Sequence, residues 1–299
     1  MDEVREKRTL GEVITSEKYY RWLLIGPLIL TLAVFMLYPF FHCLYYSTQR
    51  YVPGQPNVFI GLDNFRYVLA DAEFWSALGI NLQVIVACII IELVLGLAIA
   101  LLWYREFRGQ NLIRALCLLP LLVSPLVMSM IWAFIFQYDI GPINQLLLAA
   151  GLPQLNWLTP GWALFSISLI TSWQWLPFSI FVLFAGLRGL PRDVFEAAKV
   201  DGASPWYTFR RITLPSLMPL VLIIVLLRTM WLIRLFDPLY GTTRGGSGTQ
   251  SLDWVVFRTS FAYFDMGVGS TMALISLFLT IILCAILFRY LMKALGAIK

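Results

Sequence analysis

Charged residues and histidine are scarce in this chain of 299 residues. Charged residues make up 13% of the sequence, against roughly 25% in ordinary soluble domains, and the only histidine is His42. A single histidine excludes a multi-histidine metal site. The G-x4-G-K-[ST] phosphate-binding loop is also missing, so we expect no nucleotide, metal or other cofactor on this chain. The cysteines lie inside apolar stretches and do not indicate a disulfide framework; they are Cys43, Cys88, Cys117 and Cys284.

Apolar residues take the place of the missing charges. They form 60% of the chain, against roughly 45–50% in soluble proteins, and the mean hydropathy is +0.78. Crossing the hydrocarbon core of a bilayer takes about 20 apolar residues, and lipid-exposed backbone must satisfy its own hydrogen bonds by forming a helix. We therefore predict an all-α integral membrane protein with six transmembrane helices, over residues 22–49, 77–104, 115–138, 162–187, 217–240 and 266–288.

Lysine and arginine are distributed unevenly over the two sides of this arrangement. If the N-terminus is cytoplasmic, sixteen of the 22 basic residues lie on the cytoplasmic side, four lie opposite, and Arg228 and Arg234 lie within a span. Because cytoplasmic segments of membrane proteins carry the excess of Lys and Arg, both termini are expected in the cytoplasm. The membrane domain is then 22–291, flanked by cytoplasmic tails 1–21 and 292–299. The net charge of +5 does not indicate a nucleic-acid partner.

Several functions of six-span proteins are excluded by what they would require. A voltage-gated channel needs a helix with a basic residue at every third position and a carbonyl filter, and neither is present. A mitochondrial-type carrier needs three similar repeats, which the sequence does not contain. A membrane enzyme needs paired acids, a nucleophile set or metal ligands, whereas Glu92 is the only acid well inside a span. Catalysis by this chain is not expected.

The cytoplasmic loop 188–215 has a more specific pattern. Pro191 with Asp193 predicts the start of a short helix, and Gly202 predicts its end in a tight turn. Ser204-Pro205 predicts the start of a second short helix. Its apolar residues repeat at helical spacing and are Trp206, Phe209 and Ile212. From physics alone, this loop either inserts into a groove of another protein or lies on the membrane surface as an amphipathic linker.

A motif within this loop resembles a known family. The pattern E-A-A-x3-G-x9-I-x-L-P is matched by Glu196, Ala197, Ala198, Gly202, Ile212, Leu214 and Pro215. It is similar to the coupling loop between the fourth and fifth helices of bacterial ABC importer permeases of the binding-protein-dependent class. Weaker similarities to the carbohydrate branch follow in order over roughly 25–290, at Tyr38-Pro39, Gly61-Leu62, Asn64-Phe65, Leu119-Pro120, Trp173, Pro177-Phe178, Ala185-Gly186-Leu187, Phe236-Asp237, Gly267 and Gly269-Ser270.

The resemblance implies a transport subunit of the bacterial cytoplasmic membrane. This chain would form half of a translocation pathway, beside a second homologous permease. ATP and Mg would be bound by a cytoplasmic ABC ATPase dimer, and a periplasmic sugar-binding protein would deliver the carbohydrate. Glu196 would pair with a basic group of the ATPase or, alternatively, only cap a helix terminus. The implied coupling residues are Glu196, Ala197, Ala198, Asp201, Gly202, Ile212, Leu214 and Pro215.

The resemblance also implies that the cargo is contacted by the spans on either side of the loop. The matching positions are Ser172, Gln174, Trp175, Phe178, Arg234, Phe236, Asp237 and Tyr240. Aromatic faces cover the apolar face of a sugar, and amide, carboxylate and hydroxyl groups bond its hydroxyls. Alternatively, the aromatic residues only pack in the bundle, and Arg234 and Asp237 only pair with each other, three residues apart.

The identity of the cargo stays open at this point. Arg228, Arg234 and Arg244 make one pathway segment basic, which favours an acidic cargo such as a uronic oligosaccharide or a phosphorylated polyol. Transporters of neutral sugars carry similar arginines, so a neutral oligosaccharide remains the alternative. The loop after the fifth span reads T-R-G-G-S from Thr243, where the family often has T-x-G-G-P. A different function, a non-transporting membrane scaffold that tethers a soluble partner through 188–215, remains the alternative. An ion-driven carrier has no use for a coupling motif.

Overall fold

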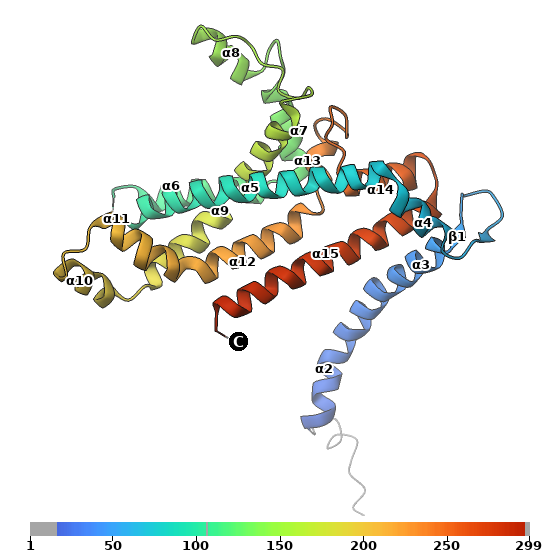
Figure 1. Cartoon of the computed structure of the whole chain (residues 1–299), viewed down its shortest axis with the longest axis horizontal. Helices are drawn as coiled ribbons and strands as arrows, with labels where there is room; N and C mark the ends of the chain where they lie inside the picture. The colour runs from blue at the N-terminus through green and yellow to red at the C-terminus, as the bar shows by residue number, and fades with distance from the viewer. Residues whose placement is uncertain (1–16, 106, 297–299) are drawn as a thin grey trace, which may run out of the picture.

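The computed structural model of the protein describes residues 17–105 and 107–296 (Figure 1). The predicted cytoplasmic tails therefore fall partly outside the described residues, at 1–16 and 297–299. Within the described residues, the regular structure is helical apart from one small antiparallel pair, β1 (Gln49–Arg50) and β2 (Val58–Phe59). The longer helices are α2 (Glu17–Leu32), α3 (Tyr38–Ser47), α4 (Asp63–Ala70), α5 (Ala72–Tyr104), α6 (Gln110–Cys117), α7 (Pro125–Ile135), α8 (Pro142–Ala149), α9 (Ala163–Gly189), α10 (Arg192–Val200), α12 (Leu214–Leu232) and α15 (Met266–Ala294).

Short helical segments join these elements. Three of them are π-helical turns. η1 (Ala33–Leu37) and η3 (Phe209–Thr213) connect α2 to α3 and α11 to α12 without a break, and η4 (Arg258–Ala262) follows α14. The others are η2 (Leu119–Leu122), α11 (Pro205–Thr208), α13 (Asp237–Tyr240) and α14 (Leu252–Phe257).

Five helices of the described residues are long and apolar enough to cross a membrane. They are Trp22–Ser47, Ala72–Tyr104, Ala163–Gly189, Pro205–Leu232 and Met266–Ala294. The expected third span, 115–138, is not one straight helix, because α6–η2 and α7 meet at an angle of 101°. The break lies at Val123 and Ser124, whose ψ angles of 136° and 135° are extended. The ring of Pro125 disfavours helical geometry at the residue before it. The bundle has six spans if this bent pair counts as one.

The fifth span also differs from the prediction. It begins at Pro205 and ends at Leu232, whereas we expected 217–240. The second short helix predicted in the loop, at Ser204-Pro205, is thus the first turn of a continuous membrane helix. At the other end, the chain turns after Leu232 and re-forms a single helical turn, α13. The apolar window continues past this turn, so hydropathy alone predicts a helix that is too long at this end.

Small residues allow the central helices of the bundle to approach closely. A Cβ atom at Gly96 of α5 would lie 3.2 Å from the Cβ of Ser179 on α9. Along α9, Ser168 and Thr171 return their hydroxyls to the carbonyls four residues before them, at 2.7 and 2.8 Å, so their polarity is satisfied within the helix. Small side chains are the usual basis of helix packing in membranes, where apolar burial alone gives no preference for protein over lipid.

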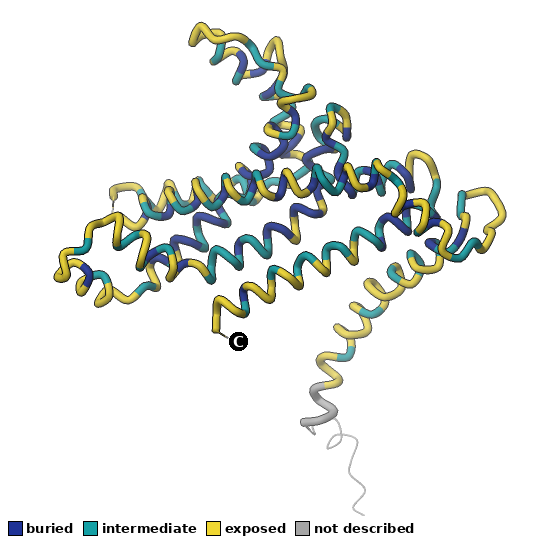
Figure 2. The backbone as a smooth tube through the Cα atoms, in the orientation of Figure 1, coloured by how far each residue is buried: buried dark blue, intermediate teal, exposed yellow. Residues whose placement is uncertain are grey.

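Two segments extend away from this bundle (Figure 1). The first helix, α2 to α3, is exposed along most of its length (Figure 2) and is attached mainly at its end, where Asn64 and Thr271 donate hydrogen bonds to the carbonyl of Ser47 at 3.0 and 3.3 Å. The second segment carries α8. Asn144 is fully buried there, donates to the carbonyl of Leu155 and accepts from the indole of Trp157. The connection 140–161 is therefore a folded arm.

Candidate functional site

The predicted coupling motif forms a helix that ends in a tight turn. α10 ends where Gly202 adopts a left-handed φ of +71°, a conformation that glycine reaches without steric cost. The N–H of Ala203 then donates to the carbonyl of Ala198 at 2.9 Å, and the N–H of Gly202 donates to that of Lys199 at 3.2 Å. These two bonds satisfy carbonyls at the helix end that would otherwise have no partner. The glycine in the motif is therefore explained by backbone geometry.

Five of the eight predicted coupling residues line one concave surface. The concavity has a volume of about 760 Å³ and lies between α10 and the first turns of the following helix. Ser204 begins that helix by accepting a hydrogen bond from the N–H of Tyr207 at 3.2 Å. Leu214 and Pro215 lie in the first turn of α12, after the concavity. The predicted residues that line it are Ala197, Ala198, Asp201, Gly202 and Ile212.

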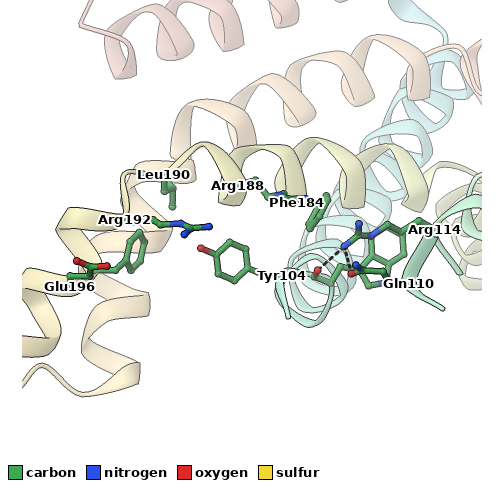
Figure 3. Close-up of a pocket in the computed structure, with 10 residues that line it drawn as sticks. Tyr104, Gln110, Arg114, Phe184, Arg188, Leu190, Arg192 and Glu196 are labelled. Atoms are coloured by element: carbon green, nitrogen blue, oxygen red, sulfur yellow. Dashed lines mark hydrogen bonds between the residues drawn. The ribbon is translucent and has the colours of Figure 1, made fainter. Parts of the chain in front are cut away.

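Glu196 lies on a different side of α10 from this concavity. It is exposed and occupies the middle of the helix, so it caps neither end. Together with Arg192 it lines a separate pocket against the ends of α5 and α9, shown in Figure 3. A carboxylate in this position is open to a basic group of another protein.

A second cavity lies where α12 ends. It has a volume of about 580 Å³, and three of the predicted pathway residues line it, Arg234, Phe236 and Asp237. Sequence reasoning missed the remaining lining residues, which include the charged Asp253. They come from α12, α14 and η4 and are Trp231, Asp253, Val256, Phe257 and Phe261. Asp253 lies between the fifth and sixth predicted spans, 217–240 and 266–288, and the signal that could have identified it is an acid beside Trp254 in an otherwise apolar run.

Buried polar side chains hold the chain in place around this cavity. Asn81 of α5 is fully buried and donates to the carbonyl of Ile233 at 2.8 Å, just after the end of α12. Its own carbonyl accepts the N–H of Leu252 at 2.8 Å, at the start of α14. Ser251 donates to the carbonyl of Leu235 at 2.5 Å. Side chains thus replace the backbone partners that are lost where the helix stops.

The charges in this cavity do not form a close pair. Among the described residues, no carboxylate oxygen lies within 4 Å of the Arg234 guanidinium, so the Arg234–Asp237 ion pair that was the alternative to cargo contact is not formed. The physical reason is the turn after Leu232, which removes the two residues from a common helix. Burial raises the pKa of the Asp253 carboxyl, while Arg234 lowers it and Asp237 raises it further. The cavity offers one guanidinium and two carboxyl groups.

The predicted aromatic residues pack against one another near this cavity. The rings of Trp175 and Trp231 are 4.2 Å apart, and those of Phe178 and Trp231 are 5.6 Å apart. Phe236 and Tyr240 lie 5.4 Å apart. The structure therefore forms two groups of rings. Trp231 joins Trp175 and Phe178, whereas Trp254 and Phe257 join Phe236 and Tyr240.

Two predicted contact residues lie away from any open surface. Ser172 and Gln174 are 1% and 3% exposed. The amide of Gln174 donates to the carbonyl of Val123 at 2.8 Å, at the break before α7. This bond gives Gln174 a structural role, because it satisfies a carbonyl that the bent span leaves without a helical partner.

A buried ion pair that the sequence did not reveal lies beside the group of rings that contains Trp175. Arg228 of α12 donates from Nε and Nη2 to the two carboxylate oxygens of Glu92 on α5, at 2.6 Å each. The side chains are 1% and 0% exposed, and the guanidinium lies 5.0 Å from the ring centre of Trp175. The bidentate geometry satisfies two charges that would be expensive in a membrane interior.

Comparison with known proteins gives the family. Residues 92–296 match the family described as binding-protein-dependent transport system inner membrane component. The trehalose/maltose transport system permease protein MalF of Thermococcus litoralis is 33% identical over 279 residues, which cover 90% of this chain and 94% of that protein. The probable starch degradation products transport system permease protein AmyD of Thermoanaerobacterium thermosulfurigenes is 32% identical, with coverage of 90% and 92%.

The fold is also found among solved structures. A chain of a bacterial ABC transporter involved in the import of the acidic polysaccharide alginate superposes with a TM-score of 0.77 at 17% identity, covering 95% of this chain and 98% of that one. At this identity the similarity concerns the fold. The family match covers more than half of the chain, and the predicted family is confirmed. The protein belongs to the binding-protein-dependent transport system inner membrane components, the membrane-spanning permease subunits of ABC importers, in which a separate subunit hydrolyses ATP.

Proposed function

We propose that this chain forms half of the translocation pathway of a carbohydrate importer. The cavity at the end of α12 carries the proposal, because it combines charged groups with aromatic rings next to a break in a membrane helix. Sugars are bound by this combination, with rings against their apolar faces and charged groups on their hydroxyls. The names of the relatives MalF and AmyD, which refer to trehalose, maltose and starch products, support a carbohydrate cargo.

The charges of the cavity favour a neutral oligosaccharide. Arg234 faces two acids, Asp237 and Asp253, while Arg228 is neutralised by Glu92. The sequence segment contains three arginines, but the cavity itself combines one arginine with two acids. An acidic cargo would therefore be repelled by the carboxylates there. Hydroxyl groups accept hydrogen bonds from a guanidinium and donate them to carboxylates, so a neutral sugar uses both kinds of group.

The coupling proposal rests on the surface of α10. A partner helix or loop of a cytoplasmic ATPase would fill the concavity lined by Ala197, Ala198 and Gly202, where small residues permit close approach. Glu196 would pair with a basic group of that ATPase. Closure of the ATPase dimer would move α10 together with the continuous helix Pro205–Leu232, which ends at the cavity. The distribution of Lys and Arg supports a cytoplasmic position for α10 and for both termini.

The remaining parts of the assembly follow from the same proposal. The second homologous permease would supply the other half of the pathway, and a periplasmic sugar-binding protein would deliver cargo on the side opposite α10. Against the scaffold alternative stands the mechanical connection between the loop and the cavity. A tether needs only the surface of α10, whereas a transporter needs a connection from the loop to the cargo site, which the helix Pro205–Leu232 provides.

The test is binding-protein-stimulated ATP hydrolysis in proteoliposomes that contain this chain with its co-purifying subunits. Neutral oligosaccharides are expected to stimulate turnover, uronate oligosaccharides much less, and Glu196→Ala should abolish the stimulation. Asp237→Asn should change the response to cargo without uncoupling the ATPase. Turnover that ignored every cargo and both substitutions would refute the importer and favour the scaffold. Stimulation by uronates alone would refute the neutral cargo but keep the importer.

A further inference from the structure

A pocket at the coupling end of the bundle shares only Glu196 with the transport proposal. It has a volume of about 390 Å³ and lies between the ends of α5 and α9, the start of α6 and the first turns of α10 (Figure 3). Its walls are aromatic at Trp103, Tyr104 and Phe184. Three arginines line it, each from a different helix, and they are Arg114, Arg188 and Arg192.

The pocket carries an excess of positive charge. Among the described residues that line it, one carboxylate, Glu196, stands against the three guanidinium groups. Within residues 17–105 and 107–296, none of the three arginines has a carboxylate oxygen within 4 Å. Like charges that share a cavity repel one another, so the arrangement favours an anion that brings them together.

Arg114 is held in position by the protein and keeps unused donors. Its Nη2 donates to the carbonyl of Trp103 at 2.9 Å and to the Gln110 amide oxygen at 3.0 Å, and its guanidinium lies 4.4 Å from the ring centre of Phe184. Its Nε is buried without a hydrogen-bond partner, and its Nη1 forms no hydrogen bond among the described residues, so Nη1 is the donor left for a ligand. A guanidinium has five N–H donors, so a fixed group with free donors is prepared for a ligand with several acceptor oxygens.

The other lining groups complete an anion site. Arg188 lies against the same Phe184 ring, 5.8 Å from its centre. Figure 3 shows the Tyr104 hydroxyl directed toward Arg192, where it provides a further donor. Three guanidiniums and a hydroxyl around an aromatic-walled space match a tetrahedral phosphate attached to a small organic group, since arginine binds phosphate oxygens in a bidentate manner.

We propose that this pocket binds a phosphate group, as a phosphomonoester or phosphodiester, between the membrane helices and α10. Arg114 and Arg188 belong to the bundle, whereas Arg192 is the first residue of α10. A bound phosphate joins the two and holds α10 against the ends of α5 and α9. The source is either the headgroup of an anionic lipid, at the membrane surface where the basic loops lie, or a soluble phosphate ester. The effect on ATP turnover rests on the proposed function, but binding does not.

Binding is tested on the purified transporter with its co-purifying subunits. In one arm, the complex is reconstituted in phosphatidylcholine with or without phosphatidylglycerol, and the phosphatidylglycerol retained after extraction is measured by native mass spectrometry. In the other arm, equilibrium binding of radiolabelled glycerol 3-phosphate is measured. Retained lipid identifies a headgroup, and bound glycerol 3-phosphate identifies a soluble ester. Binding of neither would overturn the proposal.

The variants are chosen so that a folding defect cannot mimic the result. Arg188→Gln removes an exposed guanidinium and is expected to weaken binding about tenfold or more. Arg114→Gln should weaken it further, but it also loses the bond to Trp103, so Arg188→Gln decides the test. Arg66→Gln, at an exposed arginine that pairs with Asp63, is the matched control and should bind as the parent does. Equal binding by Arg188→Gln and the control would overturn the site.

The consequence for coupling has its own readout. If bound phosphate holds α10, cargo-stimulated ATP turnover should differ between membranes with and without the bound ligand, and Arg188→Gln should remove that difference. Turnover that never responds to cargo refutes the proposed function, while the binding measurement still decides the pocket. Binding without any change in turnover would overturn the role of the phosphate at α10.

Discussion

Arg228 and Arg234 lie six positions apart in one apolar stretch, yet the structure uses them in opposite ways. Arg228 is buried, has two 2.6 Å bonds to Glu92 and lies by the ring of Trp175. Arg234 lies beyond the end of α12, lines a cavity and has no carboxylate within 4 Å in the described part of the chain. The first fixes α12 against α5; the second is free to bind something that enters. The position of an arginine in an apolar stretch therefore does not show whether it stabilises the bundle or lines a cavity.

The largest effect is expected from removing the partner of Arg228. Glu92→Ala leaves an uncompensated buried guanidinium, which lowers the free energy of unfolding by about 3–5 kcal/mol. The loss is measured as a lower melting temperature and a lower yield of the complex in detergent. The double variant Glu92→Gln with Arg228→Leu should recover most of it, since no charge is left unpaired. A single variant as stable as the parent would show that the pair is not structural.

A smaller loss is expected at Asn81, which supports the turn that carries Arg234. Asn81→Ala removes three hydrogen bonds and leaves buried backbone groups unsatisfied, at about 1–3 kcal/mol for each such group. Stability and cargo affinity should fall together, because this side chain fixes both the end of α12 and the start of α14. Loss of stability with unchanged cargo affinity would show that the turn held by Asn81 does not contribute to cargo binding.

Arg234 itself should affect cargo and leave the fold intact. Arg234→Gln is expected to raise the KM for cargo-dependent transport about tenfold, the range for a lost hydrogen bond from a charged group, with an unchanged melting temperature. Arg234→Lys, which keeps the charge, should recover part of the affinity. A fall in melting temperature as large as that of Glu92→Ala would contradict the division between the two arginines.

The smallest effect is expected at an ion pair outside the bundle core. Arg66 and Asp63 are 3.2 Å apart with exposed side chains, so Asp63→Asn should change the free energy of unfolding by no more than about 1 kcal/mol. The melting temperature in detergent checks this, and added salt should reduce the difference further. A large effect would mean that this surface is covered in the assembled transporter.

Local patterns account for most of what was predicted correctly. The length and apolarity of each window gave the membrane class and the spans 77–104 and 162–187 nearly as observed. The turn at Gly202 followed from residue type, because a left-handed φ is favoured by glycine. Predictions were wrong where tertiary contacts override hydropathy, at the bend before Pro125 and at the end of α12. An apolar window does not show where a side chain of another helix will form hydrogen bonds with backbone groups at a helix break.

The sequence by itself determined the membrane class, the family and the position of the loop that carries Glu196, because each depends on residues close together in the chain. Only the tertiary structure decided which charges meet. Glu92 and Arg228 are 136 positions apart, and Asp253 joins Arg234 in a cavity through contacts that Asn81 makes across the bundle. Such pairings depend on how helices pack and where they stop, and neither is encoded in the periodicity of a single span.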